Sequence, residues 1–235
     1  MIVKRIALVL ALVAMVGTVG WGALRMSGSR SRQLVGELLT RVETTDSVVA
    51  LTFDDGPTPH HTDSVLAILA EHDARATFFM VGQAMERNPD VVRRVLRHGH
   101  EIANHSYSHR RMLLMRPSTI RREVDRTDAL ILQTGQAGRP FMRPPYGRRL
   151  VGLPAYLARQ GRPVALWDVE PDTYAHKADA VVDYTLEHVR PGSIILLHVE
   201  IPARRENRKA LPLILEELTA RGYRFVTLSE LVGER

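Results

Sequence analysis

The chain has 235 residues, no cysteine and a formal net charge of +6. The length fits one α/β domain or two smaller domains, and a hydrophobic content of 45% excludes an intrinsically disordered polymer. Without cysteine there is no disulfide scaffold, thiolate metal site or cysteine nucleophile, and the basic balance by itself suggests nucleic acid, a membrane surface or an acidic polymer as partner.

The first segment is an apolar stretch, residues 6–24, that carries no charge and follows Lys4 and Arg5. As a helix it would be about 28 Å long, which matches the hydrocarbon core of a bilayer. It is also longer than the apolar region of a typical secretory signal peptide. We therefore expect residues 1–26 to be an uncleaved anchor that holds the rest of the chain outside the cytoplasm. A cleaved signal peptide, which would release a secreted protein, is the alternative.

Residues 27–46 are rich in Ser, Gly and Arg and then partly acidic, which predicts a linker with one short helical stretch. Residues 1–46 contain six basic and three acidic side chains, so half of the net charge belongs to the anchor and linker. The remaining charge is unremarkable and no basic-aromatic stripe is present, so we expect no nucleic-acid partner. Membrane phospholipid is the simpler anionic partner for the basic excess.

The body, residues 47–235, alternates short apolar runs with amphipathic stretches and predicts one folded domain. The predicted strands are 48–53, 76–81, 101–104, 141–143, 164–169, 193–198 and 224–226. The predicted helices are 62–72, 89–98, 117–134, 153–160, 178–189 and 208–220. Such βα units are typical of an α/β fold with a parallel sheet covered by helices. A (β/α) barrel fits best, and an open doubly wound sheet is the alternative.

Ionisable side chains follow five of the predicted strands. They are Asp54 and Asp55, His105 and His109, Arg143, Glu170 and Asp172, and His198. In a parallel barrel the carboxyl ends of all strands meet on one rim, where active sites form. Stability alone does not explain ionisable groups from five strands on one face, so this rim is the predicted site.

The residue types suggest metal-assisted hydrolysis. Asp54 and Asp55 precede a Gly-Pro turn and are either turn residues or a metal ligand next to a base, since neighbouring strand residues point to opposite sides. His105 and His109 are spaced i, i+4, by chance or because they share a face on a helix or helix-like turn. Together with Asp55 they make two His and one carboxylate, a metal set with open positions in which zinc suits hydrolysis.

The remaining groups fit roles around such a metal. Arg143 begins Arg-Pro-Pro-Tyr-Gly and is either a structural ion-pair residue or part of the site. The two prolines have no amide donors, which leaves the Tyr146 amide as a donor to an oxyanion. His198 ends an apolar run and is either a satisfied core residue or a general acid with a pKa near neutrality.

Four motifs in order carry a family resemblance: TFDDGP (52–57), HSYSH (105–109), RPPYG (143–147) and LLH (196–198). Over about residues 47–232 the chain resembles the polysaccharide deacetylases, the NodB-like carbohydrate esterases. The resemblance implies a distorted (β/α)7 barrel, TIM-like in form, that hydrolyses a linear amide. The reaction would remove N-acetyl groups from an amino-sugar polysaccharide and release acetate. Peptidoglycan, chitin-like oligomers and an exported polysaccharide are all candidate substrates.

By position in the motifs, the resemblance implies a role for each residue of the site. Asp54 would be the base, held by Arg143, and His198 the acid. Asp55, His105 and His109 would bind a divalent metal, with Zn²⁺ expected and Co²⁺ or Ni²⁺ as alternatives. The residues that contact the substrate or oxyanion would be Tyr146, Pro144, Trp167 and Leu196.

One segment departs from the family pattern. Within residues 167–174 either Glu170 or Asp172 could orient His198, and spacing does not decide between them, although we favour Asp172. After His198 comes Val199-Glu200, where many members have Asp. This departure puts the substrate preference in more doubt than the chemistry.

Three other functions are compatible with parts of this pattern. A carbohydrate-binding module could keep the barrel without turnover, an iron oxygenase could use the two His and one carboxylate, and a deacylase of small amides could share the site. The complete motif set argues against the carbohydrate-binding module. The oxygenase chemistry needs neither Asp54 beside Asp55 nor the acid His198. We expect a monomer that contacts an N-acetylated glycan, with the membrane reached through residues 6–24.

Overall fold

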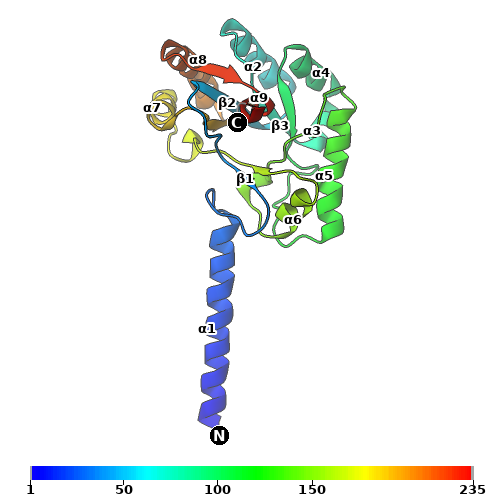
Figure 1. The fold of residues 1–235 in the computed structure, drawn as a ribbon, viewed down its shortest axis with the longest axis vertical. Coiled ribbons are helices and arrows are strands. Elements are labelled where there is room, and N and C mark those ends of the chain that lie inside the picture. The colour runs from blue at the N-terminus through cyan, green and yellow to red at the C-terminus, as the bar shows by residue number, and fades with distance from the viewer. Residues whose placement is uncertain (1, 234–235) are drawn as a thin grey trace.

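The computed structural model describes residues 2–233, in which one long helix projects from an α/β domain (Figure 1). This helix, α1 (Ile2–Ser27), contains the segment Lys4–Ser27, which is long and apolar enough to cross a membrane. An anchor and a signal sequence both have this form. The predicted apolar helix is therefore confirmed, while its retention in the mature protein stays a prediction.

A closed ring of parallel strands forms the centre of the domain. Strand β2 (Val48–Gly56) pairs on one side with β3 (Thr77–Met80), which pairs with β4 (Glu101–Asn104). At its amino end β2 pairs, on the same side as β3, with β7 (Arg224–Val226), and on its other side it pairs with β6 (Ile194–Leu197). Single bridges complete the ring. Met142 joins Asn104 to Val164 of β5 (Val164–Ala165), and Val169 joins Ile195. The result is the predicted distorted (β/α)7 barrel, and an open sheet is excluded.

Helices cover the outside of this ring. They are α2 (Pro59–Glu71), α3 (Gly82–Arg87), α4 (Pro89–Arg97), α5 (Pro117–Leu132), α6 (Gly152–Ala158), α7 (Ala178–His188), α8 (Arg205–Ala220) and α9 (Leu228–Gly233). Two short 3₁₀ turns, η1 (Pro145–Gly147) and η2 (Pro171–Thr173), lie in loops after strands. Prolines at the first helical positions of α2, α4 and α5 explain where these helices begin, because proline needs no amide partner there.

Strand β2 alternates between two apolar clusters. Val49, Leu51 and Phe53 pack outward against α2 and α8, whereas Val48 and Ala50 belong to the cluster inside the barrel. Side chains on a strand alternate between faces, so the inward series continues through Thr52 to Asp54 at the carboxyl end. The apolar interior below therefore fixes the direction of the first site residue.

Several predicted elements differ from the structure. Residues 28–46 contain no helix, and strand β1 (Leu38–Leu39) within them pairs with β5, while Leu39 and Val42 are buried. The predicted short helix is therefore wrong, and the second half of the predicted linker packs as part of the domain. The predicted strand 141–143 is only the bridge at Met142, because prolines follow it closely and remove the donors that a ladder needs. Helices α3 and α9 were not predicted.

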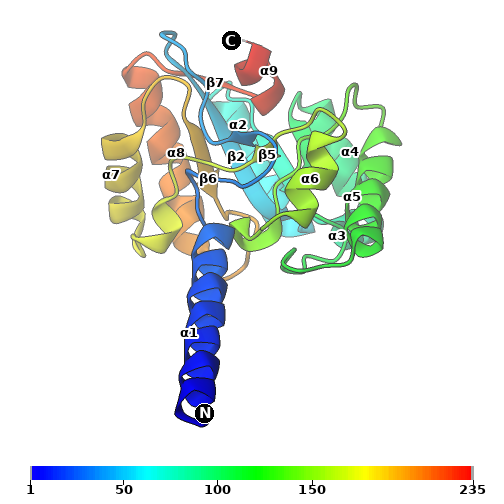
Figure 2. The ribbon, with the colours of Figure 1, turned by 60° about the horizontal axis from the view of Figure 1, so that its bottom comes forward.

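The two ends of the barrel can be assigned from hydrogen bonds. The Leu228 amide at the start of α9 donates to Thr77 Oγ1 (2.8 Å), and Ser229 bonds Glu101, so α9 lies at the amino ends of β3 and β4. Figure 2 shows α9 and α1 at opposite ends of the domain. Helix α1 therefore leaves the domain on the side of the carboxyl ends of the strands.

Candidate metal and catalytic site

The two adjacent aspartates both face one cavity at the carboxyl end of β2. This cavity has a volume of about 380 Å³, and its wall contains Asp54, Asp55, His105, His109, Tyr146, Trp167, Glu170, His198, Ile201 and Arg204. The expectation that Asp54 and Asp55 point to opposite sides is wrong. Asp55 has a φ of 75°, and the register with β3 shifts between Asp54 and Gly56, so the strand alternation ends there.

Histidine 105 presents a lone pair to the aspartates. Its Nδ1 lies 2.9 Å from the carbonyl oxygen of Arg143, which can only accept, so Nδ1 carries the proton. In the neutral ring Nε2 is then an acceptor, and it lies 3.4 Å from Asp55 Oδ1 and 3.7 Å from Asp54 Oδ2. Acceptors that face one another in a buried place need a proton or a cation between them, so these atoms are suited to hold a metal ion.

His109 completes the convergent set. Its Nε2 lies 2.8 Å from Asp55 Oδ1, and that oxygen is buried with no hydrogen-bond partner in the described part of the chain. One ligand atom each from Asp55, His105 and His109 lie within 4.8 Å of one another. Burial raises the pKa of Asp55, but positive charge on the His105 and His109 rings outweighs burial and holds that pKa below its usual value, as a bound cation at the same place would also do. The donor set fits a divalent metal with nitrogen and oxygen ligands.

The segment that carries the two histidines is a loop rather than a helix. Ser106 and His109 have φ values of 65° and 56°, in the left-handed region, and Ser106 Oγ accepts from the His109 amide. This turn brings the two imidazole centroids to 5.0 Å. Non-glycine residues in that region are strained and cluster at functional sites. The predicted proximity of the two histidines is therefore confirmed, but a loop with left-handed residues produces it in place of the predicted helix or helix-like turn.

Arg143 lies beneath the aspartates and is fully buried. Its Nη1 donates to Asp54 Oδ1 (2.6 Å) and to Thr52 Oγ1 (3.0 Å), and its Nη2 donates to the carbonyl of Leu166 (2.9 Å). The guanidinium also lies over the ring of Phe79, 3.8 Å from its centroid. The positive charge compensates the Asp54 carboxylate and leaves Asp54 Oδ2 directed toward His105.

On the opposite wall, Asp172 holds His198. Asp172 Oδ2 accepts from Nδ1 of His198 (2.6 Å) and from its amide (3.1 Å), while Asp172 Oδ1 accepts from Asn207 Nδ2 (2.6 Å). Burial lowers the pKa of His198, but the hydrogen bond to Asp172 and the charges of Asp54 and Asp55 outweigh it and raise that pKa to about 8. The Nε2 atom faces the cavity, 3.9 Å from Asp55 Oδ2. Glu170 bonds Arg30 instead (3.2 Å).

The other predicted substrate residues fall into two groups. Tyr146, with a φ of 60° after Pro144 and Pro145, lies exposed at the mouth, and Trp167 lines the cavity with a buried indole nitrogen that has no partner in the described residues. Pro144 and Leu196 are buried and are not among the described residues that line the cavity. Their predicted contact with substrate therefore stays a prediction, because both side chains lie behind the residues of the cavity wall.

Two groups near the site were not predicted as site residues. Asn207 comes from α8 and has no sequence signal, because its contact with Asp172 depends on how α8 packs against η2. Glu200, fully buried, bonds the Thr62 hydroxyl, and its carboxyl group fills the space where a Gly56 side chain would lie. Burial, together with the charges of Asp55 and Asp54, raises the pKa of Glu200 to about 7. The burial of Glu200 could not be predicted from the LLH motif that precedes it.

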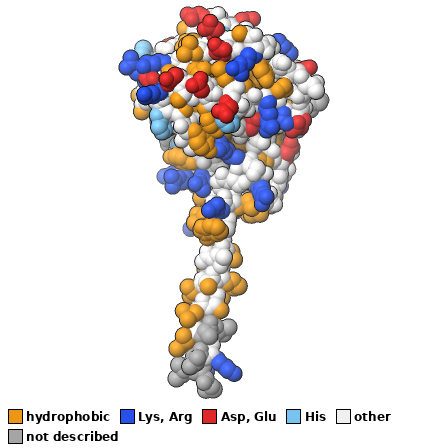
Figure 3. Space-filling view, turned by 90° about the vertical axis from the view of Figure 1, so that its left-hand side faces the viewer, with side chains coloured by type: hydrophobic (Ala, Val, Ile, Leu, Met, Phe, Trp, Pro, Cys, Tyr) orange, Lys and Arg blue, Asp and Glu red, His pale blue; other side chains and the backbone are white. Residues whose placement is uncertain are grey.

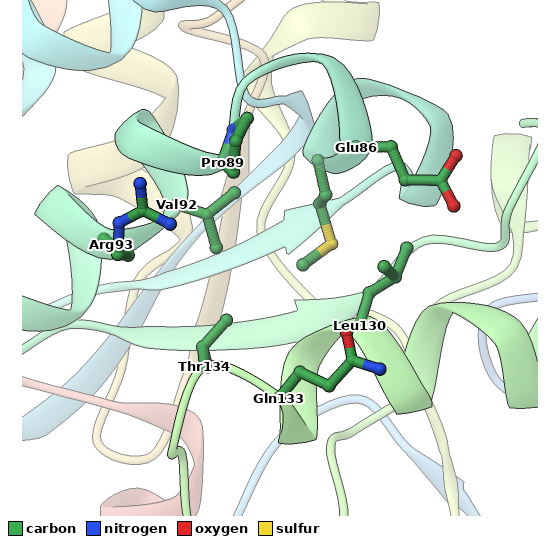
Figure 4. A pocket seen from close by; sticks show the side chains of 8 residues that line it. Glu86, Pro89, Val92, Arg93, Leu130, Gln133 and Thr134 are labelled. Carbon is green, nitrogen blue, oxygen red and sulfur yellow. The ribbon is translucent and has the colours of Figure 1, made fainter.

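A second pocket lies away from the barrel rim, between α3, α4 and α5 (Figure 4). Of the residues that line it, Glu86 and Arg93 are the ionisable ones. Neither a histidine nor a buried carboxylate belongs to this wall, so it offers no acid, base or metal set. The chemistry of the chain therefore gathers at the rim.

Comparisons with known proteins agree with this geometry. The family model described as polysaccharide deacetylase matches residues 41–164. A peptidoglycan-N-acetylglucosamine deacetylase of Bacillus cereus is 35% identical over 201 residues, which cover 84% of this chain and 93% of that protein. A chitooligosaccharide deacetylase of Bradyrhizobium sp. is 33% identical over 196 residues, 78% of this chain and 90% of that protein.

A solved structure extends the agreement to three dimensions. The crystal structure of a peptidoglycan N-acetylglucosamine deacetylase in complex with a benzamide ligand matches with a TM-score of 0.78 and 31% identity. The match covers 84% of this chain and 94% of that chain. The fold, the four motifs and these likenesses agree, and the chain belongs to the polysaccharide deacetylase family.

Proposed function

We propose that the chain is a metal-dependent hydrolase that removes N-acetyl groups from an amino-sugar polysaccharide outside the cytoplasm and releases acetate. The observation that carries the proposal is the convergence of Asp55, His105 and His109 beside Asp54 and His198 in one cavity. The named relatives, a peptidoglycan deacetylase and a chitooligosaccharide deacetylase, support the same substrate class. Peptidoglycan, chitin-like oligomers and exported polysaccharide all fall within it.

Asp55, His105 and His109 would hold the divalent ion, for which Zn²⁺ is the first candidate and Co²⁺ or Ni²⁺ are alternatives. When bound, such an ion supplies Lewis-acid chemistry, polarising the acetyl carbonyl and lowering the pKa of the attacking water. The Arg143 carbonyl, which fixes the protonated nitrogen of His105, would keep the free nitrogen directed at the ion.

The other groups would then move protons and stabilise charge. Asp54, whose Oδ1 is held by Arg143, accepts a proton from the attacking water through its second oxygen. The tetrahedral oxyanion accepts a hydrogen bond from the Tyr146 amide. His198, protonated and oriented by Asp172, donates its proton to the departing amine. The C–N bond breaks, the oxygen of the water becomes a carboxylate oxygen of acetate, and the amino sugar leaves as an amine.

The domain assignment follows the same proposal. Residues 1–26 would be the anchor or signal segment, and residues 47–235 the catalytic domain, with β1 contributed from the preceding segment. We propose a monomer without nucleic-acid partners. A retained anchor would keep the domain at the extracytoplasmic face of the membrane, and cleavage of the anchor would release the domain.

The test is acetate release by the full-length chain from N-acetylglucosamine oligomers and from peptidoglycan, compared with the Asp54→Asn variant. We expect acetate from at least one of these substrates, with loss of acetyl mass from the glycan, and about 10²- to 10⁴-fold less from the variant. Equal release by both proteins would refute the proposal. Oxygen uptake with a 2-oxoacid in place of acetate release would instead identify an iron oxygenase.

A further inference from the structure

The end of α1 is fastened to the mouth of the candidate site. Ser27, 1% exposed, accepts at its carbonyl from the Arg149 amide (3.0 Å), and its hydroxyl lies 3.3 Å from Arg148 Nη1. Arg148 and Arg149 directly follow η1, which carries Tyr146 of the cavity wall. The apolar helix therefore ends on the loop that forms the mouth, with no flexible connection between them.

A second attachment lies across the mouth. Arg30 donates to Glu170 (3.2 Å), a residue of the cavity wall, and to the Tyr174 hydroxyl (3.0 Å). Arg149 Nη2 also donates to the carbonyl of Arg32 (3.2 Å). Helix α1 leaves the domain on the side of the carboxyl ends of the strands (Figure 2), and the cavity, which lies at these ends, therefore opens on the same side as the helix.

The distance from the bilayer to the mouth follows from helix geometry. The uncharged span ends at Leu24, three residues before Ser27, which is about 4.5 Å along the helix. The headgroup layer on each side of a bilayer is about 5–7 Å thick. Trp21 and Arg25, which stack at 4.7 Å, are residue types that favour this interface. The mouth would thus lie at headgroup level.

The surface around the mouth suits contact with anionic lipid. Exposed basic residues border it. They are Arg111, which lies over the Tyr146 ring, Arg148, which directly follows η1, and the partly exposed Arg204 of the wall. Leu114, 91% exposed, projects from the loop that follows the metal histidines. Figure 3 shows basic and hydrophobic side chains on the part of the domain nearest α1, whereas the acidic side chains lie farther away. Basic groups near a lipid surface gain from its negative potential, and an exposed leucine gains from the acyl boundary.

We propose that the mouth of the site lies against the headgroups of the membrane that α1 enters, and that the substrate is an N-acetylated glycan carried by a lipid of that membrane. This inference rests on the proposed function and on a retained α1. A glycan linked to lipid emerges at headgroup level, where the cavity would be, whereas a polymer farther out would have to bend back to reach it. The contacts of Ser27 and Arg30 with the mouth would hold the cavity at this level, which a free linker after the anchor would not do.

The docking part is tested without turnover. The chain has no cysteine, so Leu114→Cys gives a single labelling site, and Glu71→Cys at the end of α2 gives a control on the opposite side of the barrel. The full-length protein is placed in phosphatidylglycerol–phosphatidylethanolamine vesicles with lipids that quench a fluorophore. We expect strong quenching at Leu114 and little at Glu71. Equal weak quenching at both positions would overturn the docking.

The substrate part compares one glycan in two forms, an N-acetylglucosamine oligomer on a lipid in the same vesicles and the same oligomer in solution. We expect the lipid-linked form to release acetate at least about tenfold faster. The control variant has an 18-residue Ala-Glu-Lys helix inserted between Arg25 and Met26, which lifts the mouth by about 27 Å over five turns and keeps the Ser27 and Arg30 contacts. It should lose that preference and still hydrolyse the soluble oligomer.

The outcomes separate the two proposals. Equal rates on both forms, or a preference that survives the helical insertion, would overturn the lipid-linked substrate and leave the deacetylase function intact. If neither form releases acetate, as with Asp54→Asn, the proposed function fails and the substrate inference fails with it. The Leu114 quenching decides the docking in either case, because it needs no turnover.

Discussion

The hydrogen bond between Asp172 and His198 sets the pH range of the proposed reaction. The His198 pKa is raised from its usual 6.5 to about 8, a difference of 1.5 units or about 2 kcal/mol of preference for the protonated ring. A general acid must be protonated, so activity should fall as pH rises through that value. In Asp172→Asn the charge is removed at similar volume. We expect the basic limb of the kcat/KM profile to move down by about one unit, toward 6.5, and kcat to fall.

The measurement is acetate release between pH 5 and 10 by both proteins in the same metal-loaded state, so that their difference isolates Asp172. Asn207→Ala is the matched control. It removes the 2.6 Å bond to the other oxygen of Asp172 but keeps the charge, and should shift the limb less. A basic limb that stays at the same pH in Asp172→Asn, with the protein folded and the metal retained, would refute the role of His198 as the acid.

Three further predictions concern the metal, the buried ion pair and a buried acid. His105→Ala should lose metal and turnover together, whereas Asp54→Asn should keep the metal; loss of metal from Asp54→Asn in elemental analysis would reverse the roles given to the two aspartates. Arg143→Met leaves the Asp54 carboxylate buried and unpaired, so the free energy of unfolding in urea should fall by about 3–5 kcal/mol, and an unchanged value would contradict the buried pair. Glu200 is neutral in the folded chain up to about pH 7 but ionises above 4.5 when unfolded, so stability should decrease by up to about 3 kcal/mol as pH rises through that window. Glu200→Gln should abolish this decrease, and a variant with the same pH dependence as the native chain would show that the decrease has another source.

The parts of the fold that were predicted correctly are those in which local pattern and tertiary packing agree. The predicted strands 101–104 and 224–226 coincide with β4 and β7, and Pro89 marks the start of α4. The strand-end positions of the ionisable groups predicted the rim because parallel strands bring their carboxyl ends together. The short helices α3 and α9 were not predicted, since six residues are too few to show a helical periodicity.

What could not be predicted depends on contacts between distant segments. Strand β1 has only two residues, and its partner β5 lies more than a hundred residues later in the sequence. The local sequence of this segment therefore predicts a linker. The direction of Asp55 depends on a left-handed backbone that strand alternation does not include. The choice between Glu170 and Asp172 is made by packing. Arg30, from the segment after α1, pairs with Glu170, and Asp172 remains for His198.

The central claim is that turnover needs one metal held by Asp55, His105 and His109. Its most direct test is to remove metal from the full-length chain with a chelator and add Zn²⁺ back stepwise while acetate release from an N-acetylglucosamine oligomer is measured. We expect activity to be lost on chelation and to rise linearly to a plateau at one equivalent of Zn²⁺ per chain, with no recovery in His105→Ala. Full acetate release by the metal-free chain, or recovery in His105→Ala equal to that of the native chain, would contradict the account.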